Sequence, residues 1–126
     1  MGPTYTTVLV RPLSGVGEGF AESFLVDTGA IDCVVSAAKL RAAGIEPEGK
    51  DTYELADGRS IEMLYGFARV TILGAETVTK VAFAPEGAES ILGVVALESI
   101  GIGVDPVTRA PKKMAAKPLK AAAPPA

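Results

Sequence analysis

The sequence predicts a small, mostly β, barrel-like domain with one or two short helices. Short runs rich in β-branched and aromatic residues recur along the chain, and clusters of glycine, proline and acidic residues separate them. Only two segments carry a helix pattern. At 126 residues the chain is long enough for one domain with a modest core.

The strand predictions rest on β-rich composition bounded by turn residues. The clearest turn signal is Asp57-Gly58, which lies between two strand-like segments and predicts a hairpin. The segments expected to form strands are 4–10, 20–27, 33–36, the two arms of the hairpin within 52–73, 77–84, 90–93 and 102–105.

Two short helices are expected between these strands. The first follows Ser36, a good N-cap residue, and is expected to end with Gly44 at its C-cap. The second begins at Val94 and is closed by Gly101.

Charge divides the chain into an acidic body and a basic end. Residues 1–106 carry fifteen acidic and seven basic side chains, whereas residues 107–126 are rich in Ala, Pro and Lys and contain five basic residues and no acid. We therefore expect a folded domain over 1–106 and a flexible extension over 107–126. The acidic body argues against nucleic-acid binding.

The residue types present exclude several kinds of site. A single cysteine, Cys33, excludes an internal disulfide, and the absence of histidine removes the usual zinc sites and the Ser-His-Asp and Cys-His arrangements. Any catalysis must use carboxylates, Lys, Tyr, Cys33 or hydroxyls, and we expect neither metal nor cofactor.

The hydropathy of the sequence bears on where in the cell the protein is expected. No apolar run approaches the ~20 residues of a membrane span. The segment Met1–Val10 has no basic region followed by a long apolar stretch, so it does not have the pattern of a secretory signal. We expect a cytoplasmic protein without a membrane span.

Asp27 raises the main question of function. It interrupts an apolar run between Phe24 and Val35, at the expected edge of the core. Burying a lone charge is costly, so such a carboxylate is normally paired, neutralised or functional. The simplest alternative is an N-cap aspartate or an aspartate in an ordinary β-turn.

Two segments resemble motifs of the retroviral-type aspartic proteases. "FLVDTGAIDCVV", from Phe24 to Val35, resembles the catalytic segment, and "ILGVVALESIG", from Ile91 to Gly101, resembles the closing motif. About 60 residues separate Gly29 from Gly93, with the predicted hairpin between them. The resemblance covers roughly residues 8–105 and implies a small closed β-barrel of the retropepsin-like type.

The resemblance implies catalysis by Asp27, Thr28 and Gly29. Two close carboxylates can activate water and protonate a carbonyl, because they share one proton. The chain has one Asp-Thr-Gly, so the second carboxylate is expected from another copy, which makes the enzyme a homodimer. Thr28 is expected to bond across to its counterpart, and Gly29 to let the backbone approach the carboxylate.

The resemblance also implies substrate-binding residues. The hairpin is expected to be a flap over a bound peptide, with its tip at 56–59; alignment of "GFARV" with the family instead favours a tip near 64–66. For Ile91 and Leu92 core packing is the alternative. The expected substrate-binding residues are Ala30, Asp32, Ala56, Asp57, Gly58, Arg59, Ile91 and Leu92.

The function expected from these observations is that of a homodimeric aspartic endopeptidase acting on protein or peptide substrates. The alternative is a catalytically weak dimerisation or peptide-binding module that keeps the same fold.

Overall fold

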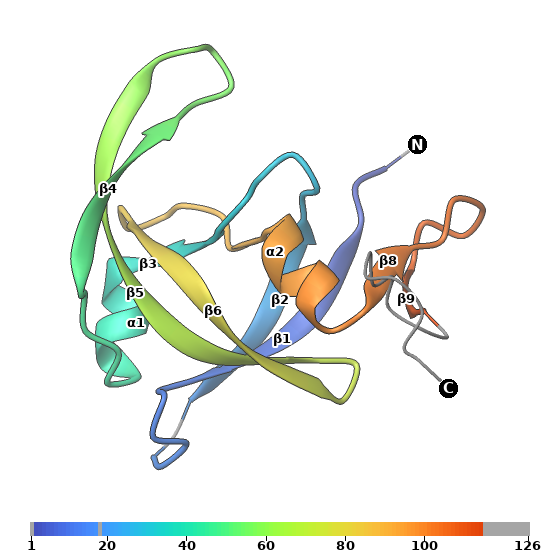
Figure 1. The fold of residues 1–126 in the computed structure, drawn as a ribbon, viewed down its shortest axis with the longest axis horizontal. Coiled ribbons are helices and arrows are strands. Elements are labelled where there is room, and N and C mark those ends of the chain that lie inside the picture. Colours follow the sequence, from blue (N-terminus) through green and yellow to red (C-terminus); the bar gives the residue numbers. More distant parts are fainter. Residues whose placement is uncertain (1, 18, 115–126) are drawn as a thin grey trace, which may run out of the picture.

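The computed structural model describes residues 2–17 and 19–114 as a ring of strands with two short helices (Figure 1). It is mostly β, as the sequence predicts. The elements are β1 (Tyr5–Arg11), β2 (Phe20–Val26), β3 (Cys33–Ser36), α1 (Ala37–Ala42), β4 (Gly49–Glu54), β5 (Ser60–Ile72), β6 (Ala75–Ala84), β7 (Ile91–Leu92), α2 (Val94–Ser99), β8 (Ile102–Val104) and β9 (Pro111–Lys113).

The main sheet closes on itself. Its strand order is β1-β2-β7-β3-β6-β5-β4, and an additional pairing of β1 with β5, the strand before last, closes the ring, with Val10 opposite Val70. Among the described strands β4 pairs with β5 alone, so the β4–β5 hairpin extends beyond the ring (Figure 1). The sheet is mixed, because β2–β7 and β3–β6 are parallel and the other pairs antiparallel.

The hairpin turns where the Asp57-Gly58 signal predicts. Leu55 donates its N–H to the Arg59 carbonyl at 2.7 Å, and the Gly58 N–H bonds to the Leu55 carbonyl at 2.9 Å. Gly58 has φ +88°, a conformation that glycine adopts without strain. Residues 64–66 lie inside β5, so the turn is at the first of the two predicted positions.

Both predicted helices are present. The Ser36 side chain accepts a hydrogen bond from the Lys39 N–H at 3.4 Å, which caps α1 as the sequence predicts. The C-cap of α1 is Ala43 rather than Gly44, which follows it with φ +83°. In the part of the chain that is described, neither helix is long and apolar enough to cross a membrane.

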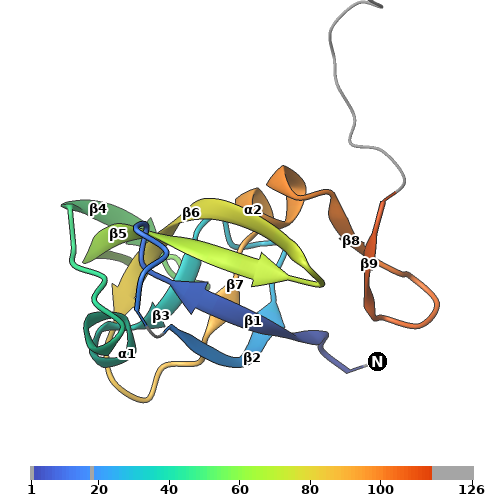
Figure 2. The ribbon, with the colours of Figure 1, turned by 90° about the horizontal axis from the view of Figure 1, so that it is seen from below.

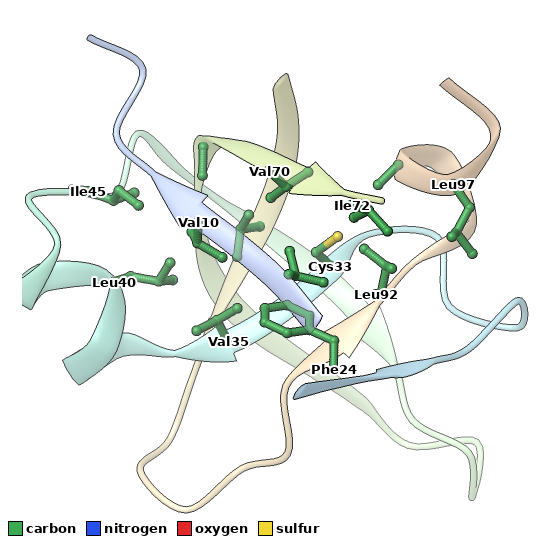
Figure 3. Close-up of a cluster of buried hydrophobic side chains, with 14 of the residues drawn as sticks. Val10, Phe24, Cys33, Val35, Leu40, Ile45, Val70, Ile72, Leu92 and Leu97 are labelled. Atoms are coloured by element: carbon green, nitrogen blue, oxygen red, sulfur yellow. The ribbon is translucent and has the colours of Figure 1, made fainter. Parts of the chain in front are cut away.

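The hydrophobic core fills the ring (Figure 3). Alternate residues of β1 are buried, so Val8 and Val10 face inward, and Phe24 joins them from β2. The helices close the ends by burying Leu40 from α1 and Leu97 from α2. The ring therefore holds a packed interior, and the loops at its rim carry the candidate site.

A second, two-stranded sheet follows α2. β8 pairs antiparallel with β9, with Gly103 opposite Lys112 (Figure 2). The turn between them is capped by the Asp105 carboxylate, which accepts bonds from the N–H groups of Val107 and Thr108. Residues 107–114 of the predicted extension thus form a turn and a strand. Its remainder, 115–126, lies outside the described residues, so its flexibility stays a prediction.

Two truncations should have different effects on stability. Ending the chain after residue 106 removes β9, leaves one edge of β8 unpaired, and deletes the 2.6 Å bond from the Thr4 hydroxyl to the Arg109 carbonyl. Each lost hydrogen bond costs roughly 1 kcal/mol, so we expect the melting temperature to fall by at least about 5 °C. Ending after Met114 should change it little. Equal melting temperatures for the two variants in a calorimetric scan would contradict this prediction.

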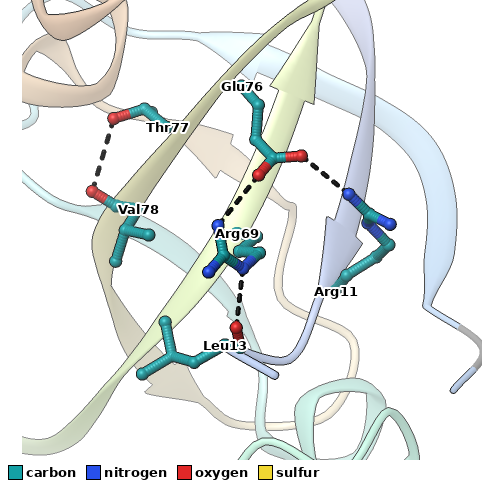
Figure 4. A network of polar contacts seen from close by, with 6 residues as sticks. All are labelled: Arg11, Leu13, Arg69, Glu76, Thr77 and Val78. Atoms are coloured by element: carbon teal, nitrogen blue, oxygen red, sulfur yellow. Dashed lines mark hydrogen bonds and ion pairs between the residues drawn. The ribbon is translucent and has the colours of Figure 1, made fainter. Parts of the chain in front are cut away.

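An ion-pair network joins three strands on the outside of the ring (Figure 4). Glu76 of β6 binds Arg11 of β1 at 2.7 Å and Arg69 of β5 at 3.0 Å. Arg69 also donates to the Leu13 carbonyl at 2.6 Å. The Arg69 hydrogen bond, with that from Arg11, holds the pKa of Glu76 below its ordinary value.

This network should make stability depend on pH in the acid range. Because the pKa of Glu76 is lowered by folding, its contribution is present above the ordinary value of 4.5 and is lost as pH falls through the folded-state value. We expect Glu76→Gln to be less stable than wild type at pH 7 and to lose less stability between pH 5 and 3. Glu86→Gln, in an exposed turn, is the control. Parallel acid limbs for wild type and Glu76→Gln would contradict the assignment.

Candidate active site

Asp27 lies directly after β2, where the chain turns back toward the ring. Its N–H donates to the Leu92 carbonyl at 3.1 Å, and its carbonyl accepts from the Ala30 N–H at 3.1 Å, which closes a tight turn over 27–30. Asp27 and Ala30 are half-buried, while Thr28 and Gly29 are exposed. The turn therefore presents the Asp27 carboxylate at the rim of the ring.

Gly29 lets the backbone approach this carboxylate. The Gly29 N–H donates to Oδ1 of Asp27 at 2.9 Å. An added Cβ at Gly29 would lie 3.2 Å from that oxygen, which is tighter than ordinary contact. The hydrogen bond fixes the orientation of the carboxylate, and the close approach predicted for this glycine is present.

The second sequence motif, residues 91–101, packs against the loop that continues from the Asp27 turn. Gly93 packs so closely that an added Cβ would lie 2.5 Å from the Ile31 carbonyl oxygen and 2.6 Å from that of Asp32. The next two residues, at the start of α2, donate their N–H groups to the same loop: Val94 to the Ala30 carbonyl at 2.8 Å and Val95 to the Ile31 carbonyl at 3.3 Å. The two motifs therefore form one structural unit.

Cys33 lies next to this unit and is buried. Burial raises the pKa of its thiol to about 11, although hydrogen bonds from the Gly93 backbone and the Thr79 side chain oppose the shift. The thiol therefore stays protonated at neutral pH, and it packs in the core instead of acting as a nucleophile.

The hairpin tip is polar and solvent-exposed. Ala56, Asp57, Gly58 and Arg59 are all exposed. The Asp57 carboxylate accepts from the Arg59 N–H at 3.0 Å and from its Nε at 2.7 Å. This ion pair is local to the turn and does not join the tip to the rest of the ring.

The two apolar residues predicted to line a substrate pocket differ in exposure. Ile91 is half-buried and pairs with Leu25 of β2 and Val34 of β3. Leu92 points the other way and is completely buried in the core. The structure thus favours the packing alternative for Leu92, while Ile91 keeps an accessible surface.

Asp32 is turned toward the base of the hairpin. Its Oδ2 accepts a hydrogen bond from the Tyr53 hydroxyl at 2.9 Å and lies 3.7 Å from Nζ of Lys80. Its side chain is only 14% exposed. The carboxylate is therefore already engaged within the chain, which the resemblance did not predict.

Sequence reasoning missed Tyr53, Lys80 and Asp51 as neighbours of Asp32. The sequence held part of the signal, because Asp51 and Tyr53 are two residues apart in a strand and therefore lie on the same face. Placing Lys80 beside Asp32 requires the β3–β6 pairing, which joins segments far apart in the chain and has no local signal.

The described residues form a surface hollow away from Asp27, and they form no candidate metal site. The hollow, of about 450 Å³, lies at the opposite end of β2 from Asp27 and is lined by residues that include Phe20, Glu22 and Lys39. Residues 2–17 and 19–114 contain no group of three or more acidic, Cys or His side chains that could hold a metal.

Comparison with known proteins matches the part of the chain that holds the Asp27 turn and Gly93. The sequence model of the family described as gag-polyprotein putative aspartyl protease matches residues 18–99. The match covers more than half of the 126 residues and includes the Asp27 turn, the hairpin and residues 91–99 of the second motif. No curated protein matches the chain.

Proposed function

The chain belongs to the gag-polyprotein putative aspartyl protease family, and on this premise we propose that it hydrolyses peptide bonds as a homodimeric aspartic endopeptidase. The observation that carries the proposal is the Asp27 carboxylate, held at the rim of the ring by Gly29 and supported by the Gly93 motif. The cytoplasmic location of the protein stays a prediction.

The need for two copies follows from how the other aspartates are used. Asp32 accepts from Tyr53, and Asp51 binds Lys80. Asp57 binds Arg59, and Asp105 caps the turn before β9. Each already has a partner in its own chain, so none is free to act as a second catalytic carboxylate. A second copy supplies one through a two-fold axis between the two Asp27 turns.

Exposed apolar side chains beside the turn support contact with that copy. Ile31 follows the Asp27 turn and is 68% exposed, and Val95 at the start of α2 is 50% exposed. The hydrogen bond from the Val95 N–H to the Ile31 carbonyl keeps their backbones together. Covering such side chains in an interface removes apolar surface from water, which favours association.

The proposed mechanism uses the pair of Asp27 carboxylates as both acid and base. Two carboxylates a few ångströms apart cannot both ionise, so they share one proton and titrate as a pair. The ionised member removes a proton from water as it attacks the peptide carbonyl, and the protonated member donates to the carbonyl oxygen. The hairpin tip closes over the peptide and excludes bulk solvent, while the attacking water stays beside the Asp27 pair.

Sedimentation and inhibition together test this function. At micromolar concentration we expect a species of about twice 12.9 kDa, and we expect cleavage of a random peptide library between pH 3 and 8, read by mass spectrometry. A statyl-type inhibitor, which mimics the tetrahedral intermediate, should block the cleavage. A strictly monomeric species that still cleaves peptides would show that the dimeric mechanism is wrong.

A second candidate function is a peptide-binding or dimerisation module with little hydrolytic activity. The observation that favours it is the engagement of Asp32, which the resemblance assigns to substrate binding but which the structure ties to Tyr53 and Lys80. Peptide binding that persists without any cleavage sensitive to the inhibitor would select this alternative.

A further inference from the structure

Five polar and aromatic side chains meet at the base of the β4–β5 hairpin. They join the loop after Asp27 to β4, β5 and β6, and we call them the Asp32 cluster. Its members are Asp32, Asp51, Tyr53, Tyr65 and Lys80.

Lys80 is the centre of the Asp32 cluster. Its Nζ lies 2.5 Å from Oδ2 of Asp51 and 3.7 Å from Oδ2 of Asp32, and it sits over the ring of Tyr65 at 4.3 Å from the centroid. Tyr53 completes the connection by donating its hydroxyl to Asp32 at 2.9 Å. One lysine and one tyrosine therefore link both arms of the hairpin to the active-site loop.

Strand register explains why these side chains meet. Alternate residues of β4 face inward, which puts Gly49, Asp51 and Tyr53 on one face. Gly49 lies opposite Tyr65 and leaves room for its ring, because an added Cβ would lie 2.5 Å from the Tyr65 hydroxyl oxygen. Lys80 directly precedes Val81, which pairs with Cys33, so the β3–β6 pairing brings it beside Asp32.

The protonation states make these contacts charge-assisted at neutral pH. The hydrogen bond to Asp51 raises the pKa of Lys80, and the reciprocal bond lowers the pKa of Asp51. Burial, followed by the hydrogen bond to Asp32, raises the pKa of Tyr53. Tyr53 is therefore a neutral donor and Lys80 a cation, and hydrogen bonds that involve an ionised group are the stronger kind.

We propose that the Asp32 cluster is a brace that fixes the base of the hairpin against the loop carrying Asp27, so that hairpin motion is confined to residues 55–59. Tyr53 and Lys80 are then positioning residues, which set where the hairpin lies over a bound peptide. The role in catalysis rests on the proposed function, whereas the mechanical role of the brace does not.

Loosening the brace should change KM and kcat differently from removing a catalytic group. A loosened hairpin weakens its hold on the substrate in the ground state and in the transition state equally, so it raises KM and leaves kcat unchanged. The pH dependence of kcat should also be unchanged, because none of the altered side chains takes part in the Asp27 pair.

Hydrogen–deuterium exchange on the full chain tests the brace without requiring activity. Tyr53→Phe removes only the hydroxyl, and Lys80→Met removes the charge while keeping most of the aliphatic length. In both variants we expect amides of 49–54 and 60–65 to exchange on the order of tenfold faster, the scale of losing one hydrogen bond to a charged group. Amides of β1 should keep the wild-type rate.

Two further variants separate positioning from general destabilisation. Lys80→Arg keeps a cation within reach of both carboxylates and should restore slow exchange in the hairpin. Tyr5→Phe is the matched control, because its hydroxyl donates to Glu89 at 3.0 Å, outside the Asp32 cluster. Its hairpin should exchange at the wild-type rate.

The outcomes distinguish this inference from the proposed function. Unchanged hairpin exchange in Tyr53→Phe and Lys80→Met overturns the brace, and so does equal acceleration throughout the ring. Accelerated hairpin exchange in a protein that cleaves no peptide supports the brace while the endopeptidase proposal fails. If peptides are cleaved, a higher KM at constant kcat supports positioning, and a lower kcat at constant KM overturns it.

Discussion

Replacing Asp27 by asparagine should abolish peptide hydrolysis and leave the dimer folded. The amide is nearly the same shape as the carboxylate and its oxygen can still accept the Gly29 N–H, so the turn should keep its geometry. It cannot remove a proton from water or share one with its counterpart, and acid–base groups contribute factors of roughly 10²–10⁴. We expect kcat/KM to fall by on the order of 10³-fold or more, measured with one peptide that has no titrating side chains.

The matched control is another aspartate changed in the same way. Asp105→Asn alters a carboxylate that caps the turn before β9 and keeps an oxygen for the Val107 and Thr108 N–H groups. The kcat/KM of Asp105→Asn for peptide hydrolysis should stay near that of wild type. Sedimentation of Asp27→Asn should still show the dimer, and we expect that variant to associate more tightly, because it removes the repulsion between two close carboxylates. Retention of most activity in purified Asp27→Asn would mean that the wrong carboxylate was chosen.

The strands and the hairpin could be predicted from the sequence because their signals are local. β1 alternates buried and exposed residues, and Asp57-Gly58 supplies the turn between β4 and β5. Ser36 likewise caps α1 through the oxygen of its own side chain. Each of these features depends on residues a few positions apart, and such features can be read from one sequence.

β9 and the Asp32 cluster could not be predicted, because they depend on pairing between distant segments. Pro111–Lys113 is short, begins with proline and carries two lysines, so its composition resembles that of an extension until β8 provides a partner. Lys80 sits in a β-rich run where a lysine normally faces solvent, and only the β3–β6 register places it beside Asp32.

The candidate site was predictable in part for the same reason. Asp27 and Gly29 are close in sequence, so the motif implies the turn that holds the carboxylate. The different exposure of Ile91 and Leu92 depends on which face of a two-residue strand meets the core, and sequence periodicity cannot decide this over so short a segment.

Gly93→Ala should destabilise this protein strongly, although it adds only one methyl group. The new Cβ would lie 2.5 Å from the Ile31 carbonyl oxygen and 2.6 Å from the backbone of Asp32, and these contacts involve backbone that cannot rotate away. Overpacking of this kind typically costs about 1–3 kcal/mol, and we expect the upper end of that range. The melting temperature should fall by roughly 10–20 °C, measured by calorimetry.

The expected effect is specific to the contact between the two motifs, and Gly103→Ala is the matched control. Gly103 has no heavy atom within 4 Å of an added Cβ and does not have a positive φ, so alanine should be tolerated there. Because the displaced loop carries Asp27, Gly93→Ala should also reduce hydrolysis at temperatures where the variant remains folded by circular dichroism. If the two alanine variants melt within a degree or two of each other, Gly93 does not hold the Asp27 loop in place.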